Sequence, residues 1–111
     1  MKNVAVLIFV CILFGSCGGS SSEKKAEIDP ALALLEKNNC KTCHKPAEKF
    51  IGPSFHDIAA RYAGYPDTIV QHLAQKVISG GTGVWDSVPM APHPDLLPSE
   101  AETLVRYVLR Q

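Results

Sequence analysis

Two cysteines three residues apart, and the histidine that follows them, are the residues of this chain best suited to chemistry. They are Cys40, Cys43 and His44, in the stretch CKTCH. This spacing suits three kinds of site: a metal site of thiolate and imidazole ligands, a dithiol that exchanges disulfides, or a pair of thioethers that tether a haem. Each kind needs different supporting residues, so the rest of the sequence can separate them.

A structural zinc site needs four ligands, which usually come as two close pairs. Cys40 and Cys43 supply one pair, but His56, His72 and His93 are scattered and supply no second pair. A redox-active Cys-x-x-Cys motif follows a strand and opens a helix, whereas a predicted helix precedes this motif. The haem interpretation is favoured, because both thiols can add to the vinyl groups of one porphyrin and the next residue then places its imidazole on the iron.

A haem iron bound by His44 has a second axial position, which Met, His or Lys can fill or which can stay open. The chain has two methionines, and Met1 belongs to an export signal, so Met90 is the candidate thioether ligand. It lies in the segment VPMAP, where two prolines restrict the backbone around the sulfur. His93 is the alternative ligand, and bis-histidine ligation would lower the reduction potential.

Short helices are the elements that must position these side chains. Hydrophobic periodicity and boundary signals predict helices and no strand in the C-terminal part of the chain. The last helix is expected to begin at a capping box of Ser99 and Glu102, after a proline-rich loop that carries Met90. We therefore predict an all-α fold of about four short helices wrapped around the cofactor. The predicted helices span residues 30–38, 55–62, 68–79 and 100–110.

The first residues have the pattern of an export signal. Lys2 precedes the apolar run VAVLIFVCILF, which is too short to span a bilayer. The sequence Gly15-Ser16-Cys17 then resembles the lipobox of bacterial lipoproteins, in which the cysteine is lipidated. An ordinary signal peptide and an uncleaved anchor are the alternatives. We predict a lipoprotein-type signal peptide over residues 1–16, a flexible tether over 17–28 and one folded domain over 29–111.

Composition limits the remaining possibilities. The chain has 111 residues, with 11 Lys plus Arg and 11 Asp plus Glu, so no excess of basic residues suggests a nucleic-acid partner. Cys11 leaves with the signal and Cys17 would carry lipid, which leaves Cys40 and Cys43 in the domain. A domain this small usually needs a disulfide, metal or cofactor for stability, and a haem held by these two cysteines would provide it.

Several segments, in order, resemble the short bacterial class I monohaem cytochromes c. The likeness extends over nearly all of residues 29–111 and includes a final helix with Tyr107. It implies the cytochrome c fold and one covalently bound haem c. The segments that carry it are CKTCH (40–44), GPSF (52–55), GGTGVW (80–85) and VPMAP (88–92).

The resemblance also implies roles for individual residues. Cys40 and Cys43 would form the thioethers, while His44 and Met90 would be the axial ligands of the iron. The carbonyl group of Pro53 would accept a hydrogen bond from the ligand imidazole, which orients the ring and raises its basicity.

Four further positions belong to the implied haem environment. The indole N–H of Trp85 would donate to a haem propionate, and Lys76 would lie near a propionate. Phe55 would contribute to the apolar surroundings of the haem. His93 stands where the family often has a small polar residue such as Asn, which supports the methionine loop.

The expected function is one-electron transfer in an exported respiratory chain, without enzymatic activity. Expected partners are a redox donor and acceptor and, through the lipid anchor, a membrane on the periplasmic side of the cell envelope; we expect a monomer. Lys41, Lys45 and Lys49 flank the haem site and form either a basic docking patch or a solvated face. Two alternatives stay open: a haem sensor or peroxidase-like protein in which Met90 dissociates, and a subunit of a larger oxidase or reductase.

Overall fold

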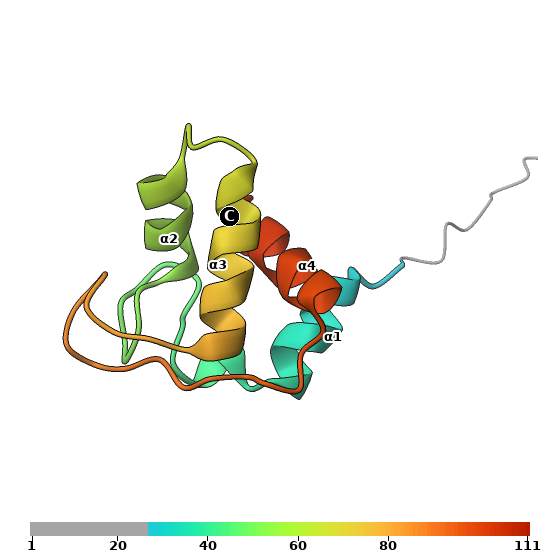
Figure 1. Cartoon of the computed structure of the whole chain (residues 1–111), viewed down its shortest axis with the longest axis horizontal. Coiled ribbons are helices and arrows are strands. Elements are labelled where there is room, and N and C mark those ends of the chain that lie inside the picture. Colours follow the sequence, from blue (N-terminus) through green and yellow to red (C-terminus); the bar gives the residue numbers. More distant parts are fainter. Residues whose placement is uncertain (1–26) are drawn as a thin grey trace, which may run out of the picture.

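The computed structural model describes residues 27–111, and in this range the fold is helical, as predicted (Figure 1). No sheet occurs among these residues, where a single isolated bridge pairs Gly81 with Met90. The predicted signal peptide, Cys17 and most of the predicted tether lie outside the described residues. No helix within residues 27–111 is long and apolar enough to cross a membrane. The helices are α1 (Pro30–Lys37), α2 (Phe55–Tyr62), α3 (Thr68–Ser79) and α4 (Pro98–Val108), with a 3-10 turn, η1 (Cys40–Thr42).

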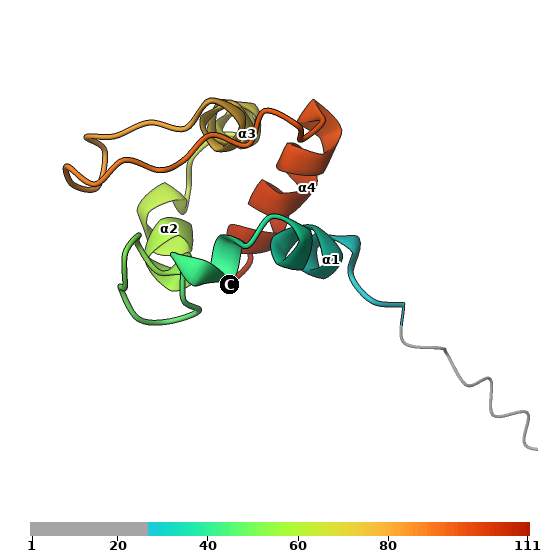
Figure 2. The same cartoon turned by 90° about the horizontal axis from the view of Figure 1, so that it is seen from below.

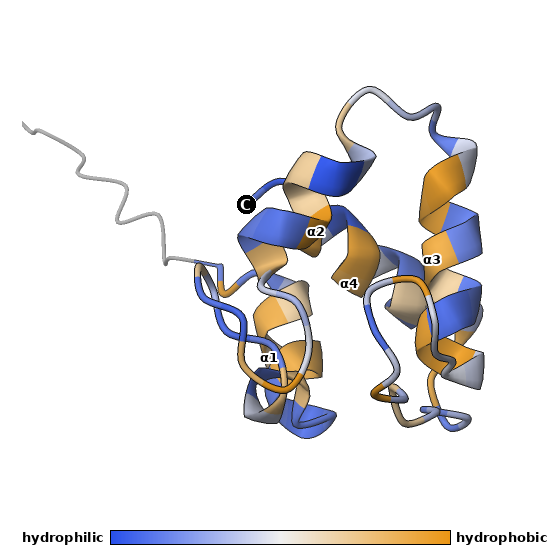
Figure 3. Cartoon of the chain, turned by 90° about the vertical axis from the view of Figure 1, so that its left-hand side faces the viewer, coloured by the Kyte–Doolittle hydropathy of each residue, from blue (hydrophilic) through white to orange (hydrophobic). Residues whose placement is uncertain are grey.

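Helix α4 is the centre of the packing. It contacts α1, α2 and α3, so the last helix joins segments from the whole length of the domain (Figures 1 and 2). Hydrophobic and hydrophilic residues alternate along the helices, as expected when one face of each is buried (Figure 3). The buried side chains form two clusters: Leu35, Phe55, Leu96 and Leu104, and Val70, Ala74, Ala101 and Val105.

The starts of α1 and α2 follow from local sequence. The Asp29 carboxylate accepts a hydrogen bond from the backbone N–H of Ala31 (2.9 Å), and Pro30 occupies the first turn of α1. The Ser54 hydroxyl accepts from the N–H of Asp57 (3.0 Å), and the Asp57 carboxylate accepts from the N–H of Ser54 (3.3 Å). This reciprocal cap fixes the direction in which α2 leaves the preceding loop.

Helix α4 begins earlier than predicted, and the expected capping box of Ser99 and Glu102 was wrong. The helix starts at Pro98, and the Glu100 carboxylate accepts from the backbone N–H of Leu97 (3.0 Å). Ser99 lies inside the first turn, where its carbonyl oxygen accepts from the Thr103 hydroxyl (2.9 Å). The reason is that Pro98, with its fixed φ and missing N–H, is well suited to the first helical position.

A long connection between α3 and α4 gives the fold its shape around the site. This segment, orange in Figures 1 and 2, projects from the end of α3 to the side where α2 lies and then returns to α4. Within this connection, residues 81–92 are referred to below as the 81–92 loop. The second connection that matters is the 45–53 loop, which joins the cysteine motif to α2.

Candidate cofactor site

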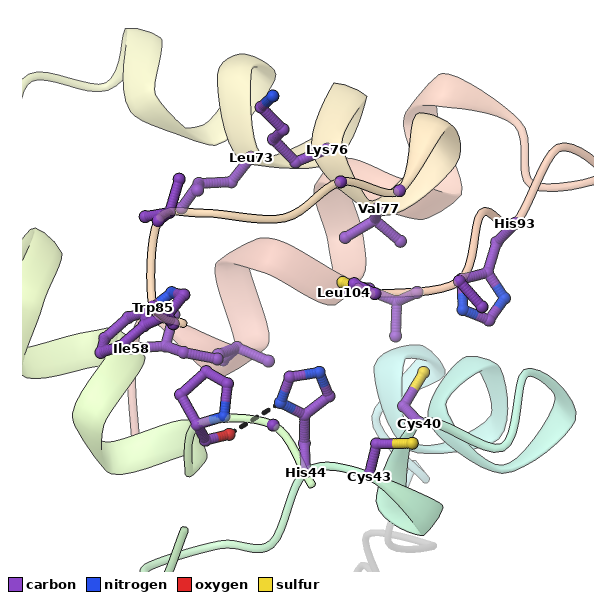
Figure 4. A pocket seen from close by; sticks show the side chains of 18 of the residues that line it. Cys40, Cys43, His44, Ile58, Leu73, Lys76, Val77, Trp85, His93 and Leu104 are labelled. Carbon is purple, nitrogen blue, oxygen red and sulfur yellow. Dashed lines mark hydrogen bonds between the residues drawn. The ribbon is translucent and has the colours of Figure 1, made fainter. Parts of the chain in front are cut away.

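One cavity of about 580 Å³ contains all the site residues predicted for the folded domain. Its size is within the range of small-molecule and cofactor sites, about 300 to 1,000 Å³. All four α-helices, the 3-10 turn and both loops contribute to its wall, and most of the wall is apolar (Figure 4). The predicted residues among its lining are Cys40, Cys43, His44, Pro53, Phe55, Lys76, Trp85 and Met90.

The cysteine motif is a tight turn that begins at a left-handed residue. Asn39 has φ 54°, a conformation that asparagine tolerates better than most residues. The carbonyl oxygen of Cys40 then accepts from the N–H groups of Cys43 (3.2 Å) and His44 (3.0 Å). Both thiols are free and half-buried, and burial raises the pKa of the Cys40 thiol. Figure 4 shows both sulfurs and the His44 ring on the same side of the pocket.

The His44 ring is held from two directions. Its Nδ1 lies 2.7 Å from the carbonyl oxygen of Pro53, which can only accept, so Nδ1 donates a proton to it and Nε2 is the ring nitrogen left to face the cavity (Figure 4). The Phe55 ring stacks on the imidazole at 5.9 Å between centroids. A Cβ atom at Gly52 would lie only 2.7 Å from His44 Cε1, so glycine allows the loop to approach the ring. This arrangement orients the imidazole so that its Nε2 can bind a metal.

Met90 lies in a backbone segment that is fixed to the end of α3. The N–H of Met90 donates to the carbonyl oxygen of Gly81 (2.8 Å), and the N–H of Gly81 donates to that of Met90 (3.2 Å). A Cβ atom at Gly80, where φ is 70°, would lie 2.5 Å from the Met90 carbonyl oxygen. The backbone at Gly80 and the backbone at Met90 therefore lie closer together than any side chain at position 80 would allow.

His93 is anchored through its backbone. Its N–H donates to the carbonyl oxygens of Val77 (3.2 Å) and Ile78 (3.0 Å), at the C-terminal turn of α3. The side chain is half-buried and lines the cavity. In Figure 4, His93 lies at the opposite end of the pocket from Trp85. His72 lines the cavity too, but both it and His56 are exposed.

At the other end of the pocket, the predicted residue Trp85 contacts a cation, Arg61, that the sequence did not point to. The Arg61 guanidinium of α2 lies 4.7 Å from the centre of the Trp85 ring, within cation–π distance. Trp85 itself is 37% exposed. Lys76, on α3, is also exposed and lines the same cavity. No local pattern indicates this contact, because Arg61 is exposed on α2 and does not line the cavity itself.

The three lysines near the cysteine motif have different surroundings. Lys49 Nζ lies 2.9 Å from Asp86 Oδ2, and Lys41 Nζ lies 3.9 Å from Glu36 Oε2. Lys45 Nζ donates to the carbonyl oxygen of Lys41 (3.1 Å) and lies over the Phe50 ring. The sequence did not predict the contact between Lys49 and Asp86, because the two residues are far apart in the chain.

The residues present fit a covalently bound haem. Two free thiols, an oriented imidazole and a thioether line one cavity, and these are the groups that attach and ligate a c-type haem. The apolar wall suits a porphyrin, whereas Lys76 and Trp85 can donate hydrogen bonds to carboxylates at its edge. Within residues 27–111, no three His, Cys, Asp or Glu side chains gather as a metal-ion site, so the zinc interpretation lacks its ligands there.

Comparison with known proteins identifies the family. The family model for cytochrome c matches residues 28–111. Cytochrome c-552 of Nitrosomonas europaea is 40% identical over 76 residues, which cover 68% of this chain and 73% of that protein. Cytochrome c-551 of Azotobacter vinelandii is 41% identical over 76 residues, covering 68% of this chain and 90% of that one.

The fold agrees with these matches. The crystal structure of wild-type Nitrosomonas europaea cytochrome c552 aligns with a TM-score of 0.67 at 38% identity, over 71% of this chain and 96% of that chain. The predicted cytochrome c fold is therefore confirmed. The chain belongs to the cytochrome c family, and it is a small c-type electron-transfer protein with one covalently bound haem, not an enzyme.

Proposed function

We propose that this chain carries single electrons between redox proteins, with its haem joined to Cys40 and Cys43 and its iron bound by His44 and Met90. The observation that carries the proposal is the cavity in which these four side chains meet. Bound haem c supplies a reversible one-electron couple, Fe(II)/Fe(III). Thioether ligation and an apolar pocket both favour the reduced iron, so a relatively high potential is expected.

The chain's own residues supply orientation and exclude water. The Pro53 carbonyl group holds the His44 ring through the 2.7 Å contact at Nδ1, which directs Nε2 to the cavity. Buried Phe55 and Leu104 form part of the apolar wall. With His44 and Met90 both holding the iron, small molecules would find no open site, which would favour electron transfer over sensing or peroxidase chemistry.

We further propose that the protein is exported and anchored by lipid. The support is the sequence alone: the apolar run before Gly15-Ser16-Cys17 and the polar stretch that follows it. Residues 1–16 would be removed, Cys17 would carry the lipid, residues 17–28 would be the tether and 29–111 the haem domain, on the periplasmic side. The mass of the purified protein tests this directly, because a diacylglyceryl group on Cys17 adds a mass that Cys17→Ser must abolish.

The partners proposed are a protein electron donor and acceptor, met by a monomer at a small and transient interface. In this proposal Lys41 and Lys45 form the basic docking patch, while Lys49 is engaged by Asp86. A decrease in electron-transfer rate with ionic strength would support basic docking, and a rate independent of salt would exclude it.

Optical spectra of protein matured in a host with c-type haem machinery test the ligand set. A ferric spectrum with the weak long-wavelength band of iron–methionine bonding supports His44 and Met90. A c-type spectrum without that band would exclude Met90 as a ligand. The second axial position would then be either bound by His93 or open. Ready binding of carbon monoxide by the reduced protein at neutral pH would favour the sensor or peroxidase-like alternative.

A further inference from the structure

We propose that the ion pair of Lys49 and Asp86 positions the 81–92 loop against the 45–53 loop, and thereby stabilises Met90 as a ligand of the iron. The inference rests on the proposed ligation by His44 and Met90. It gives positioning roles to two residues that contact neither His44 nor Met90. The pair would then hold two loops together and not merely carry surface charge.

The pair has better geometry than the other ion pairs in the described part of the chain. Lys49 Nζ lies 2.9 Å from Asp86 Oδ2, whereas the other three pairs are between 3.6 and 4.0 Å apart. The Asp86 side chain is only 29% exposed, while that of Lys49 is 60% exposed. A short contact to a half-buried carboxylate is a charge-assisted hydrogen bond and not merely two nearby charges.

Asp86 organises the loop in which it lies. Its Oδ1 accepts from the backbone N–H of Val88 (2.9 Å), and its carbonyl oxygen accepts from the N–H of Gly83 (2.9 Å). The same carbonyl oxygen also lies 3.4 Å from the Thr82 hydroxyl. Whatever holds Asp86 in place therefore holds the segment that leads into Met90.

Lys49 belongs to a loop that is equally well connected to the other ligand. The N–H of Gly52 donates to the carbonyl oxygen of Cys43 (3.0 Å), and the carbonyl oxygen of Pro53 contacts the His44 ring. The N–H of Phe55 closes the base of the loop by donating to the carbonyl oxygen of Lys45 (2.9 Å). Movement of the 45–53 loop is thus coupled to the residues that present His44.

The pair joins these two segments at the rim of the cavity. Asp86 lines the cavity and Lys49 does not, so the contact reaches the rim from outside. Within residues 27–111, this is the one hydrogen bond or ion pair between the 45–53 and 81–92 loops. The other hydrogen bonds of the 81–92 loop are internal, including those between Gly81 and Met90, and the His93 N–H just beyond it bonds to the end of α3. The outer part of the loop also contacts α2 through Arg61 and Trp85. Without the ion pair, this outer part loses its one hydrogen bond to the 45–53 loop.

A partly exposed ion pair changes an equilibrium by about 2- to 5-fold. Loss of the pair should raise the population of states with Met90 off the iron by that factor. An added ligand that binds only those states, such as imidazole on the ferric protein, should then bind about 2- to 5-fold more tightly. The increase should shrink at about 1 M salt, where charges at the surface are screened within ~3 Å.

The experiment compares the haem-loaded wild type with Lys49→Gln, Asp86→Asn and the double variant. Imidazole affinity is measured from the loss of the ferric iron–methionine band, and the potential is measured alongside. Asp86→Asn keeps a side-chain oxygen that can accept from Val88, so it removes the charge and little else. Arg106→Gln is the matched control, because Arg106 carries the same charge and pairs with Asp67 at 4.0 Å but does not line the cavity.

The expected result is that each single variant binds imidazole about 2- to 5-fold more tightly, and that the double variant equals the stronger single variant. Arg106→Gln should bind like wild type. Additive effects in the double variant, wild-type affinity in both single variants, or the same change in Arg106→Gln would each overturn the proposal. A wild-type spectrum without the methionine band would overturn the ligation itself, and the inference with it, before any variant is made.

Discussion

Replacing Gly52 by alanine should disturb the histidine ligand without straining the backbone. The added Cβ would lie 2.7 Å from His44 Cε1 and 3.0 Å from Nδ1. Ordinary carbon contacts are about 3.5 Å or longer, so the ring or the loop must move by about 0.8 Å. A retreat of that size is enough to lengthen the 2.7 Å contact between Nδ1 and the Pro53 oxygen beyond a good hydrogen bond, which ends near ~3.2 Å.

The size of the effect follows from the value of that hydrogen bond. A net contribution of about 0.5 to 1.5 kcal/mol corresponds to roughly 20 to 65 mV for a one-electron couple. The hydrogen bond raises the basicity of the imidazole, which favours ferric iron. Only the difference in the strength of this bond between the ferric and ferrous states shifts the potential, so its loss in Gly52→Ala should raise the reduction potential by at most that amount.

An equilibrium redox titration measures the change, and the NMR signal of the His44 Nδ1 proton reports the bond itself. Gly64→Ala is the control, because its Cβ would have nothing within 4 Å although φ is 80°. It should lower the stability and leave the potential unchanged. The reasoning fails if Gly52→Ala keeps the wild-type potential and proton signal, or if Gly64→Ala shifts the potential equally.

Three further predictions follow from the same contacts. Gly80→Ala should weaken the ferric iron–methionine band, because its Cβ would lie 2.5 Å from the Met90 carbonyl oxygen; an undiminished band would contradict this. Leu35→Ala should lower the free energy of unfolding by about 2 to 5 kcal/mol in denaturant titrations, since Leu35 is 2% exposed. A loss below ~1 kcal/mol would contradict this and show that neighbouring side chains fill the space that Leu35 leaves. Lys49 holds the pKa of Asp86 below its ordinary value, so the contribution of their ion pair is lost as pH falls through that lowered pKa. In Lys49→Gln the Asp86 pKa should rise towards its ordinary value in a carboxyl NMR titration, and an unchanged pKa would refute the assignment.

Local signals in the sequence predicted much of the fold. Asp29 before Pro30 indicated the start of α1, and Gly80 indicated the end of α3. These predictions succeeded because caps and breakers act within one helical turn. The start of α4 was predicted two positions too late, since two overlapping patterns competed and Pro98 with Glu100 was the better cap.

The candidate site divides in the same way. The types and spacing of Cys40, Cys43 and His44 predicted the cofactor, because its attachment chemistry needs residues that are close together in the chain. Met90 could be proposed as the thioether ligand of the iron because the chain has only one methionine besides Met1. Both predictions needed no knowledge of how distant segments meet.

Contacts between distant segments were decided by the tertiary structure alone. The approach of Gly80 to the Met90 backbone joins distant parts of the connection between α3 and α4, and the pairing of Lys49 with Asp86 joins residues that have both α2 and α3 between them. No local pattern encodes such a contact. The distance between the two residues depends on how α3 and α4 pack and on the path that the 81–92 loop takes between them. The sequence by itself determined which groups can bind the haem, whereas the packing of the helices determined how firmly those groups are held.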